Sequence, residues 1–381
     1  MSSLIYWLWL SSLKGIGSVT ARRLTGHFGS PEDVYNAGLG MYHGIAGIGA
    51  ADIHALSDKS TATAEKILAD CVSHGYQVLT QDDPGYPERL RNIYDPPVVL
   101  YVRGSLPVVD DAPVVAVAGT RKCTPYGISA AESLGYKLAR HGYIVVTGLA
   151  KGVDSAATRG ALRGGGRVIG VIGSGLDVVY PPENRVLFDD TAAAGAIISE
   201  YPPGTQPSPG QFPARNRILS GLSLGVAIIE APKHSGALIT AAKALEQGRD
   251  VFSVPGNVDA VNCEGSNALL REGAIPVLSG DDIIAEYAGL FPDMLTPEDD
   301  KKEIDNETAV EYIDLDKILC SLDGDERTVA GTIGHNTLKV DDIISVAGFS
   351  VQQVQSALTM LEIKGYAERV ENGRWKLIYE K

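Results

Sequence analysis

The residues of this chain most able to do chemistry are cations at predicted strand-to-helix junctions. Arg121 and Lys151 each follow a short apolar run, and the cluster Arg215-Asn216-Arg217 opens another predicted helix. In an open α/β sheet such junctions line the crevice at the carboxyl ends of the strands, where ligands bind. Cations beside accessible backbone N–H groups predict an anionic ligand there, either a phosphate backbone or a nucleotide.

The arginine cluster carries the strongest signal. If its helix begins near Ala214, Arg215 and Arg217 both lie in the first turn, beside the partial positive charge of the helix N-terminus. A bound anion would turn this conflict into attraction, and we expect one there. In the alternative interpretation Glu200 or Glu230 pairs with the arginines and supports the fold.

Five further residues are candidates for the same crevice. Gly119 follows the first predicted core strand directly, and Phe212 either stacks on a base beside the arginines or packs against the core. Ser235 and Gly236 open a later helix with small residues that leave its N–H groups accessible. Lys243 lies two turns further along and either reaches the crevice or faces solvent.

Short apolar runs alternate with helical patterns through the middle of the chain. Strands are predicted at 114–118, 144–146, 168–172, 196–198, 226–229 and 251–253, with helices near 126–141 and 155–163. This alternation predicts an α/β fold in which a largely parallel sheet is covered by helices on both faces. We assign residues 112–290 to this core.

The N-terminal part has a different pattern. Residues 1–80 predict small helices separated by glycine turns, and the runs 13–17 and 44–49 are typical of helix-hairpin-helix elements. Their glycines either expose N–H groups to a phosphate or simply form the turns. Residues 81–111, rich in proline and aspartate, are predicted to be a connector.

The C-terminal part is predicted to be a separate helical domain. Residues 291–312 are acidic and lack periodicity, which indicates a linker. Residues 313–381 fit a winged helix, with Ser350 capping its second helix and Gly373 at the tip of the wing.

The charge is distributed unevenly. The chain has a formal net charge of −14, which by itself argues against nucleic acid. Residues 119–167, however, hold eight basic and two acidic residues, whereas 290–330 hold thirteen acidic and four basic. The acid is therefore concentrated in the linker, and the core is locally positive.

Several classes of function are excluded by what the sequence lacks. Its four cysteines are scattered, and its histidines form no metal-binding pattern, so we expect reduced thiols and no metal. No signal peptide and no membrane span are predicted, which favours a soluble cytoplasmic protein. A dinucleotide fingerprint, a phosphate loop and a nucleophile elbow are missing, so we expect binding without catalysis or cofactor.

The core resembles the DprA (Smf) family of DNA-processing proteins over about 200 residues. The resemblance rests on the ordered motifs Tyr86-Pro87, Asp95-Pro96-Pro97, Gly119-Thr120-Arg121, Tyr126-Gly127, 148–154, 173–177, Tyr180-Pro181, Asn184, 199–202, 212–217, 235–240, 248–252 and 254–256. Two positions depart from the family pattern, because Thr120 stands where serine is usual and Thr158 where histidine is frequent.

The resemblance implies a Rossmann-like core that binds single-stranded DNA in preference to duplex, forms a homodimer, protects incoming DNA and loads RecA recombinase during natural transformation. Single-strand-binding protein is a further implied partner. The resemblance also implies an N-terminal SAM-like domain and a C-terminal winged helix. Carried over by position, the DNA pocket falls on Arg121, Phe212, Arg215, Asn216, Arg217 and Lys243.

Two alternative functions stay open at this point. A nucleotide phosphoribohydrolase would need a carboxylate near the ribose, and Glu200 and Glu230 are the candidates. A transcriptional regulator would read duplex DNA through the winged helix. The candidate recognition helix at 350–364 carries only Glu362 and Lys364 as charges, which favours protein contact or weak duplex binding.

Overall fold

The computed structural model describes residues 3–292, 319, 322, 324–334, 338–370 and 373–378. The chain divides into two compact units, Met1–Val310 and Glu311–Lys381. Of the acidic linker predicted at 291–312, all but the first two residues lie outside the described part.

A nine-stranded sheet forms the centre of the first unit, in the order β1-β2-β6-β5-β4-β3-β7-β8-β9. Its strands are β1 (Gln77–Thr80), β2 (Val99–Gly104), β3 (Val114–Gly119), β4 (Ile144–Thr147), β5 (Val168–Val171), β6 (Ala196–Ser199), β7 (Gly225–Ile229), β8 (Asp250–Ser253) and β9 (Ile275–Pro276). The strands from β6 to β9 run parallel, and β1 and β2 join antiparallel at one edge. The predicted, largely parallel α/β sheet is confirmed.

The first unit also contains thirteen described α-helices and three short 3-10 turns. They are α1 (Ser3–Ser12), α2 (Ser18–Phe28), α3 (Pro31–Asn36), η1 (Leu39–Tyr42), α4 (Ala50–Leu56), α5 (Ala62–His74), α6 (Glu88–Arg91), α7 (Pro125–Arg140), α8 (Val153–Arg163), η2 (Pro182–Asn184), α9 (Arg185–Ala194), α10 (Gln211–Leu222), α11 (Gly236–Glu246), η3 (Val261–Cys263), α12 (Glu264–Arg271) and α13 (Gly280–Tyr287).

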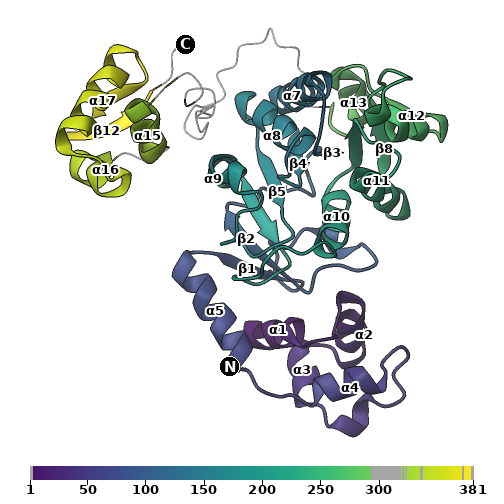
Figure 1. Cartoon of the computed structure of the whole chain (residues 1–381). Coiled ribbons are helices and arrows are strands. Elements are labelled where there is room, and N and C mark those ends of the chain that lie inside the picture. The colour runs from purple at the N-terminus through teal and green to yellow at the C-terminus, as the bar shows by residue number, and fades with distance from the viewer. Residues whose placement is uncertain are drawn as a thin grey trace. The chain divides into compact units, whose positions relative to one another are not determined.

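Helices cover both faces of the parallel strands (Figure 1). Side chains alternate across a strand, so Val114 and Ala116 of β3 point to the same face. There they share a buried apolar cluster with Ile218 of α10 and Ala241 of α11. The opposite face packs against α7, which contacts β4 and β7, and α8, which contacts β3 and β4.

Two glycines allow α7 and α8 to pack backbone to backbone. A Cβ on Gly135 would lie 2.2 Å from the carbonyl oxygen of Ala157, and one on Gly160 would lie 2.1 Å from that of Glu132. A methyl group at either Gly135 or Gly160 would force the two helices apart. This contact fixes the start of α8, where the loop after β4 ends.

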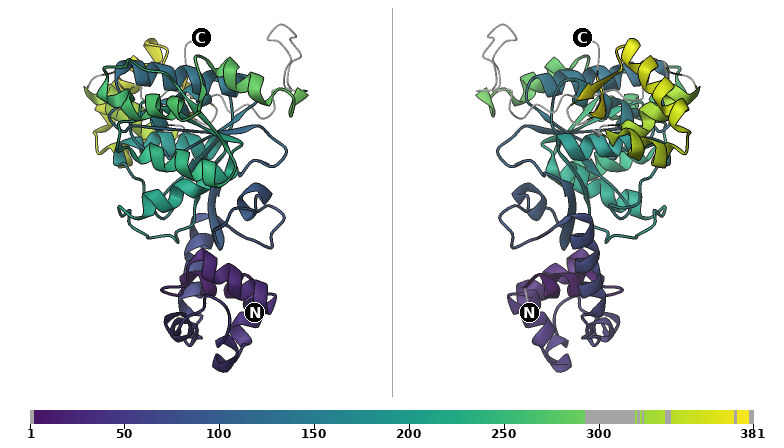
Figure 2. Two further views of the ribbon diagram at one scale, coloured as in Figure 1. Left: turned by 90° about the vertical axis from the view of Figure 1, so that its right-hand side faces the viewer. Right: turned by 90° about the vertical axis from the view of Figure 1, so that its left-hand side faces the viewer.

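The first five helices gather into a group of their own, purple in Figure 2. The two glycine runs each precede a helix, because Gly17 is the N-cap of α2 and Gly49 that of α4. Arg22 of α2 donates a hydrogen bond to the carbonyl oxygen of Ile93 at 2.8 Å and so ties this group to the segment after α6.

The stretch 81–111 contains more structure than a connector. It forms α6 and the strand β2, and the residues of β2 from Val99 to Val102 are buried. Prolines on both sides of this apolar run argued against a strand in the sequence. In the structure β2 lies between β6 and the edge strand β1.

The second unit is a winged helix, as predicted. It consists of α15 (Gly324–Ile333), β10 (Leu338–Lys339), α16 (Val340–Ala347), α17 (Val351–Ile363), β11 (Ala367–Val370) and β12 (Arg374–Leu377), with sheet order β10-β12-β11. Ser350 caps α17, accepting a hydrogen bond from the backbone N–H of Gln353 at 3.3 Å. Gly373 stands between the wing strands at φ +70°, which suits a glycine.

We predict that Gly160→Ala destabilises the core, because its new Cβ would collide with the backbone of α7. The expected loss is roughly 1–3 kcal/mol of unfolding free energy, measured by chemical denaturation. Gly26→Ala is the matched control: Gly26 lies exposed in α2 with nothing within 4 Å of the position that a Cβ would take, so alanine there should be neutral or slightly stabilising. Equal stability of the two variants would contradict the helix contact.

Candidate functional site

A cleft of about 280 Å³ opens where β3, β4 and β5 end and α10 begins. It is lined by Arg121, Gly148, Ala150, Lys151, Tyr180, Pro181, Pro182, Glu183, Phe212 and Arg215. Four of the ten residues predicted for the site therefore line one cleft: Arg121, Lys151, Phe212 and Arg215.

The loop that presents Arg121 is held at both ends by one buried residue, Glu230. The backbone N–H of Thr120 donates to the Glu230 carbonyl oxygen at 2.8 Å, and that of Thr124 donates to the Glu230 carboxylate at 2.8 Å. Glu230 adopts φ +43°, a strained value for a residue with a side chain. This clamp leaves Arg121 exposed, with its guanidinium carbon 4.9 Å from the centre of the Phe212 ring.

The cleft also has an aromatic wall. Phe212, the second residue of α10, lies half-buried with its ring centre 5.6 Å from that of Tyr180, and Tyr180 is 41% exposed. Two rings beside a guanidinium form a surface on which a planar base can stack.

The Arg215 side chain lines the cleft and is buried, at 5% exposed. Its guanidinium donates to the carbonyl oxygens of Gly148, at 3.0 Å, and Val171, and to the Asn216 side-chain oxygen at 3.2 Å. The N–H of the same Gly148 donates to the Asp154 carboxylate at 3.0 Å. Burial raises the pKa of Asp154 to about 6, opposed by the nearby Arg215 charge, and lowers the pKa of Arg215 to about 10, so Arg215 stays charged at neutral pH.

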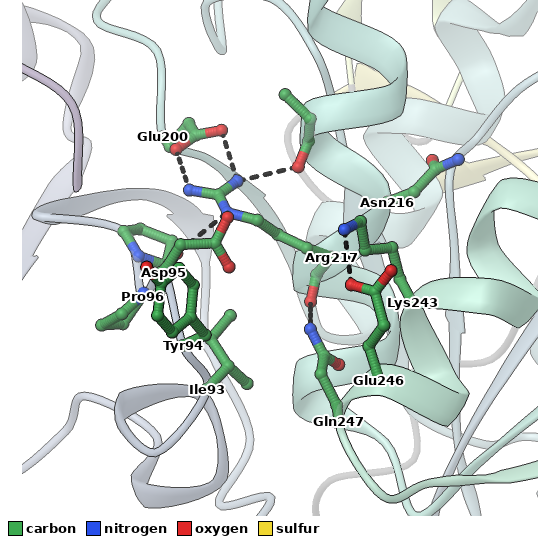
Figure 3. A network of polar contacts seen from close by, with 12 residues as sticks. Ile93, Tyr94, Asp95, Pro96, Glu200, Asn216, Arg217, Lys243, Glu246 and Gln247 are labelled. Carbon is green, nitrogen blue, oxygen red and sulfur yellow. Dashed lines mark hydrogen bonds and ion pairs between the residues drawn. The ribbon is translucent and has the colours of Figure 1, made fainter. Parts of the chain in front are cut away.

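Arg217 points away from this cleft, which corrects the expectation that both arginines face an anion. Its guanidinium forms two hydrogen bonds with Glu200, at 2.7 and 2.6 Å, and an ion pair with Asp95 at 3.1 Å (Figure 3). The alternative pairing with Glu200 is thus present in the structure. The helix also begins at Gln211 rather than near Ala214, so both arginines lie in its second turn, where the helix dipole opposes them less.

Four more predicted residues do not line the cleft. Asn216 donates to the Gly236 carbonyl oxygen at 3.4 Å, joining α10 to α11. Ser235 caps α11, accepting a hydrogen bond from its backbone at 3.2 Å. Lys243 pairs with Glu246 at 2.6 Å, one turn along the same helix (Figure 3). Asn216 and Gly236 thus join α10 to α11, Ser235 and Lys243 have partners within α11, and none of the four brings a charge into the cleft.

Gly119 does not line the cleft either, and it acts through its small size. A Cβ there would lie 2.0 Å from the carbonyl oxygen of Ile229 and 2.5 Å from the Val153 side chain. Only glycine fits at this end of β3, which lets the following residues turn toward the cleft.

Lys151 forms an exposed ion pair with Glu183, a lining residue that was not predicted from the sequence. Asp154 and Tyr180 were also missed, although both lie in motifs that supported the family resemblance. Their presence in the runs 148–154 and 180–181 was an available signal. Glu183 gave none, because one exposed acid among 47 acidic residues has no distinguishing pattern.

The carboxylates considered for an enzyme have structural partners. Glu200 accepts hydrogen bonds from Arg217, and the Glu230 carboxylate accepts one from the backbone N–H of Thr124. Neither carboxylate lines the cleft. Among the described residues no group of three or more His, Cys, Asp and Glu side chains is placed to hold a metal ion. No helix in the described ranges is long and apolar enough to cross a membrane.

We predict a pH dependence of stability from the raised pKa of Asp154. Below about pH 3 the group is protonated in both states, and between about pH 4 and 6 it ionises in the unfolded chain while the folded protein still holds the proton. The unfolding free energy of the wild type should therefore fall relative to Asp154→Asn by roughly 3 kcal/mol between pH 3 and 7. Denaturant titrations of both proteins across this range measure it, and parallel curves would contradict it.

The chain is similar to known proteins over most of its length. Residues 77–288 match the family described as DNA recombination-mediator protein A, and residues 316–373 match the DprA winged helix domain. Protein Smf from Synechocystis sp. is 34% identical over 391 residues, covering 97% of this chain and 98% of its own. DNA processing protein DprA from Streptococcus pneumoniae is 45% identical over 205 residues, covering 54% of this chain and 72% of its own.

Two solved structures share the fold. The X-ray structure of DNA processing protein A from Streptococcus pneumoniae has a TM-score of 0.65 and 36% identity, covering 75% of this chain and 98% of that one. DNA processing protein A from Helicobacter pylori, whose structure is described in terms of a single-stranded DNA binding mode, has a TM-score of 0.51 and 32% identity, covering 57% and 96%. With the core and the winged helix both matched, the chain belongs to the DNA recombination-mediator protein A family, whose members are named DprA or Smf.

Proposed function

We propose that this protein binds single-stranded DNA without sequence preference, in the cleft between Arg121, Lys151, Phe212 and Arg215. It protects incoming DNA and delivers it to RecA recombinase during natural transformation and recombination, without catalysing a reaction. The single-stranded DNA binding mode described for the Helicobacter pylori relative supports this proposal.

The observation that carries the proposal is the Arg121 guanidinium above the Phe212 ring. One side chain neutralises a phosphate, and the other offers a face on which any base can stack. Stacking needs an unpaired base, so duplex should bind more weakly. It is also tolerant of sequence, because every base has a π-face.

The proposal that the protein catalyses no reaction is supported by the partners of its candidate carboxylates. Glu200 and Glu230, the candidates for a nucleotide hydrolase, are both engaged in holding the fold, and the acid that lines the cleft, Glu183, is paired with Lys151. Release of free base from a nucleoside monophosphate by the purified protein would overturn this part of the proposal.

Two protein partners belong to the proposal. Homodimer formation is supported by apolar side chains in the segments that follow β8 and the edge strand β9, where Val258, Val261 and Leu278 are 84%, 65% and 85% exposed. Light scattering should give twice the chain mass. RecA loading should appear as faster RecA filament formation on single strands covered by single-strand-binding protein, and this acceleration should be lost when the cleft cannot hold DNA.

We predict that Arg121→Ala weakens binding of a fluorescent oligothymidine roughly tenfold, the scale of one charge-assisted contact. It should also reduce the slope of log affinity against log salt by about 0.7–1, because one fewer phosphate is neutralised. Arg121 suits the test better than Arg215 or Arg217, because its side chain is exposed and its removal leaves no buried group unpaired.

Lys122→Ala is the matched control. Lys122 is the next residue, carries the same charge and is exposed, but does not line the cleft. Its loss should change affinity much less. Equal effects of the two substitutions would indicate general surface charge rather than binding in the cleft.

A further inference from the structure

An acid stands in a cleft that otherwise offers cations. Glu183 lines it beside Lys151 and Arg121, and its carboxylate is paired with the Lys151 ammonium. Both side chains are more than half exposed, at 54% for Lys151 and 59% for Glu183. An ion pair this exposed contributes little to stability, so the fold alone gives no reason for it.

The two segments that carry the pair are fixed to each other. Asn184, next to Glu183 in η2, donates from its buried side-chain amide to the Leu149 carbonyl oxygen at 2.8 Å and to the Ser155 hydroxyl at 2.9 Å. Those acceptors flank Lys151 in sequence. The backbone that carries Glu183 is therefore fixed next to the backbone that carries Lys151, which keeps the two side chains close.

We propose that Glu183 is a specificity-determining residue, which makes the cleft favour the singly charged phosphodiesters of a DNA strand over the doubly charged phosphate of a free nucleotide. This inference rests on the proposed function, since it concerns the same cleft. Its basis is repulsion, and specificity of this kind comes from elements that act against the wrong ligand.

The electrostatic reasoning follows from the shared lysine. A phosphate bonded to the Lys151 ammonium lies within about 6 Å of the Glu183 carboxylate, because both anions contact the same group. At that separation in water-like surroundings each unit of phosphate charge weakens binding roughly threefold to fivefold. A phosphodiester carries one such charge, whereas a phosphomonoester above its second pKa, near 6, carries almost two.

The size of the cleft makes this discrimination relevant. Its volume of about 280 Å³ is close to the lower limit for pockets that enclose small ligands, so a single nucleotide can compete for it.

Interaction with Lys151 holds the Glu183 pKa below its ordinary value, which keeps the carboxylate ionised at neutral pH.

The test compares wild type with Glu183→Gln, which keeps the shape and removes the charge. Dissociation constants are measured at pH 8 and low salt for an oligothymidine with no terminal phosphate and for thymidine monophosphate, the latter by calorimetry. Glu183→Gln should tighten both, and the ratio of the nucleotide constant to the oligothymidine constant should fall threefold to fivefold. Glu246→Gln, which removes the partner of Lys243 outside the cleft, should leave the ratio unchanged.

An unchanged or increased ratio in Glu183→Gln would overturn the inference, as would weaker binding of both ligands, which would mean that the carboxylate accepts hydrogen bonds from a base. Arg121→Ala measured in parallel separates this failure from failure of the proposed function. Oligothymidine binding that does not depend on Arg121 would place DNA elsewhere, while the calorimetry would still report whether Glu183 repels a phosphate in the cleft.

Discussion

Burial of the Arg215 guanidinium is the constraint around which the site is built. A buried charge must be met by dipoles or counter-charge: here the dipoles come from the loop after β4 and from β5, and the counter-charge is Asp154 in the first turn of α8. The Gly148 carbonyl oxygen accepts from Arg215, and its N–H donates to Asp154. A Cβ on Gly148 would lie 2.4 Å from the Arg215 guanidinium, so this arrangement requires glycine. The same loop then presents Lys151 to the cleft.

Two arginines separated by one residue on α10 have different tasks. Arg215 faces the strand ends and the cleft, whereas Arg217 joins α10 to Glu200 and Asp95. The segment that holds Asp95 also receives a hydrogen bond from Arg22 of the N-terminal helices. A continuous set of polar contacts therefore runs from α2 to the helix that forms the floor of the cleft, and Arg217 supports the site without entering it.

The pattern of apolar runs predicted the parallel strands and the winged helix, because both depend on local periodicity. Partners that are distant in sequence were not predictable from it. The charges of Arg217 and Lys243 suggested a ligand, yet each has an acidic partner whose position only the fold reveals. The start of α10 at Gln211 was also missed, since Pro213 suggested a later start although proline is tolerated in the first turn of a helix. The strand β2 was hidden between prolines.

Several cations of this acidic chain are paired with its own carboxylates. Arg159 and Arg163 both form ion pairs with Glu132. Lys137 forms an ion pair with Asp281, and Lys151 forms one with Glu183. The positive charge seen along residues 119–167 is therefore smaller in the folded protein than in the sequence. Arg121 is the cation of the cleft left exposed without an acidic partner among the described contacts, and it stands over an aromatic ring. A site that combines one such cation with the paired Lys151 can bind a polyanion by exchange of ion partners, which keeps binding reversible and would suit the proposed delivery of DNA to another protein.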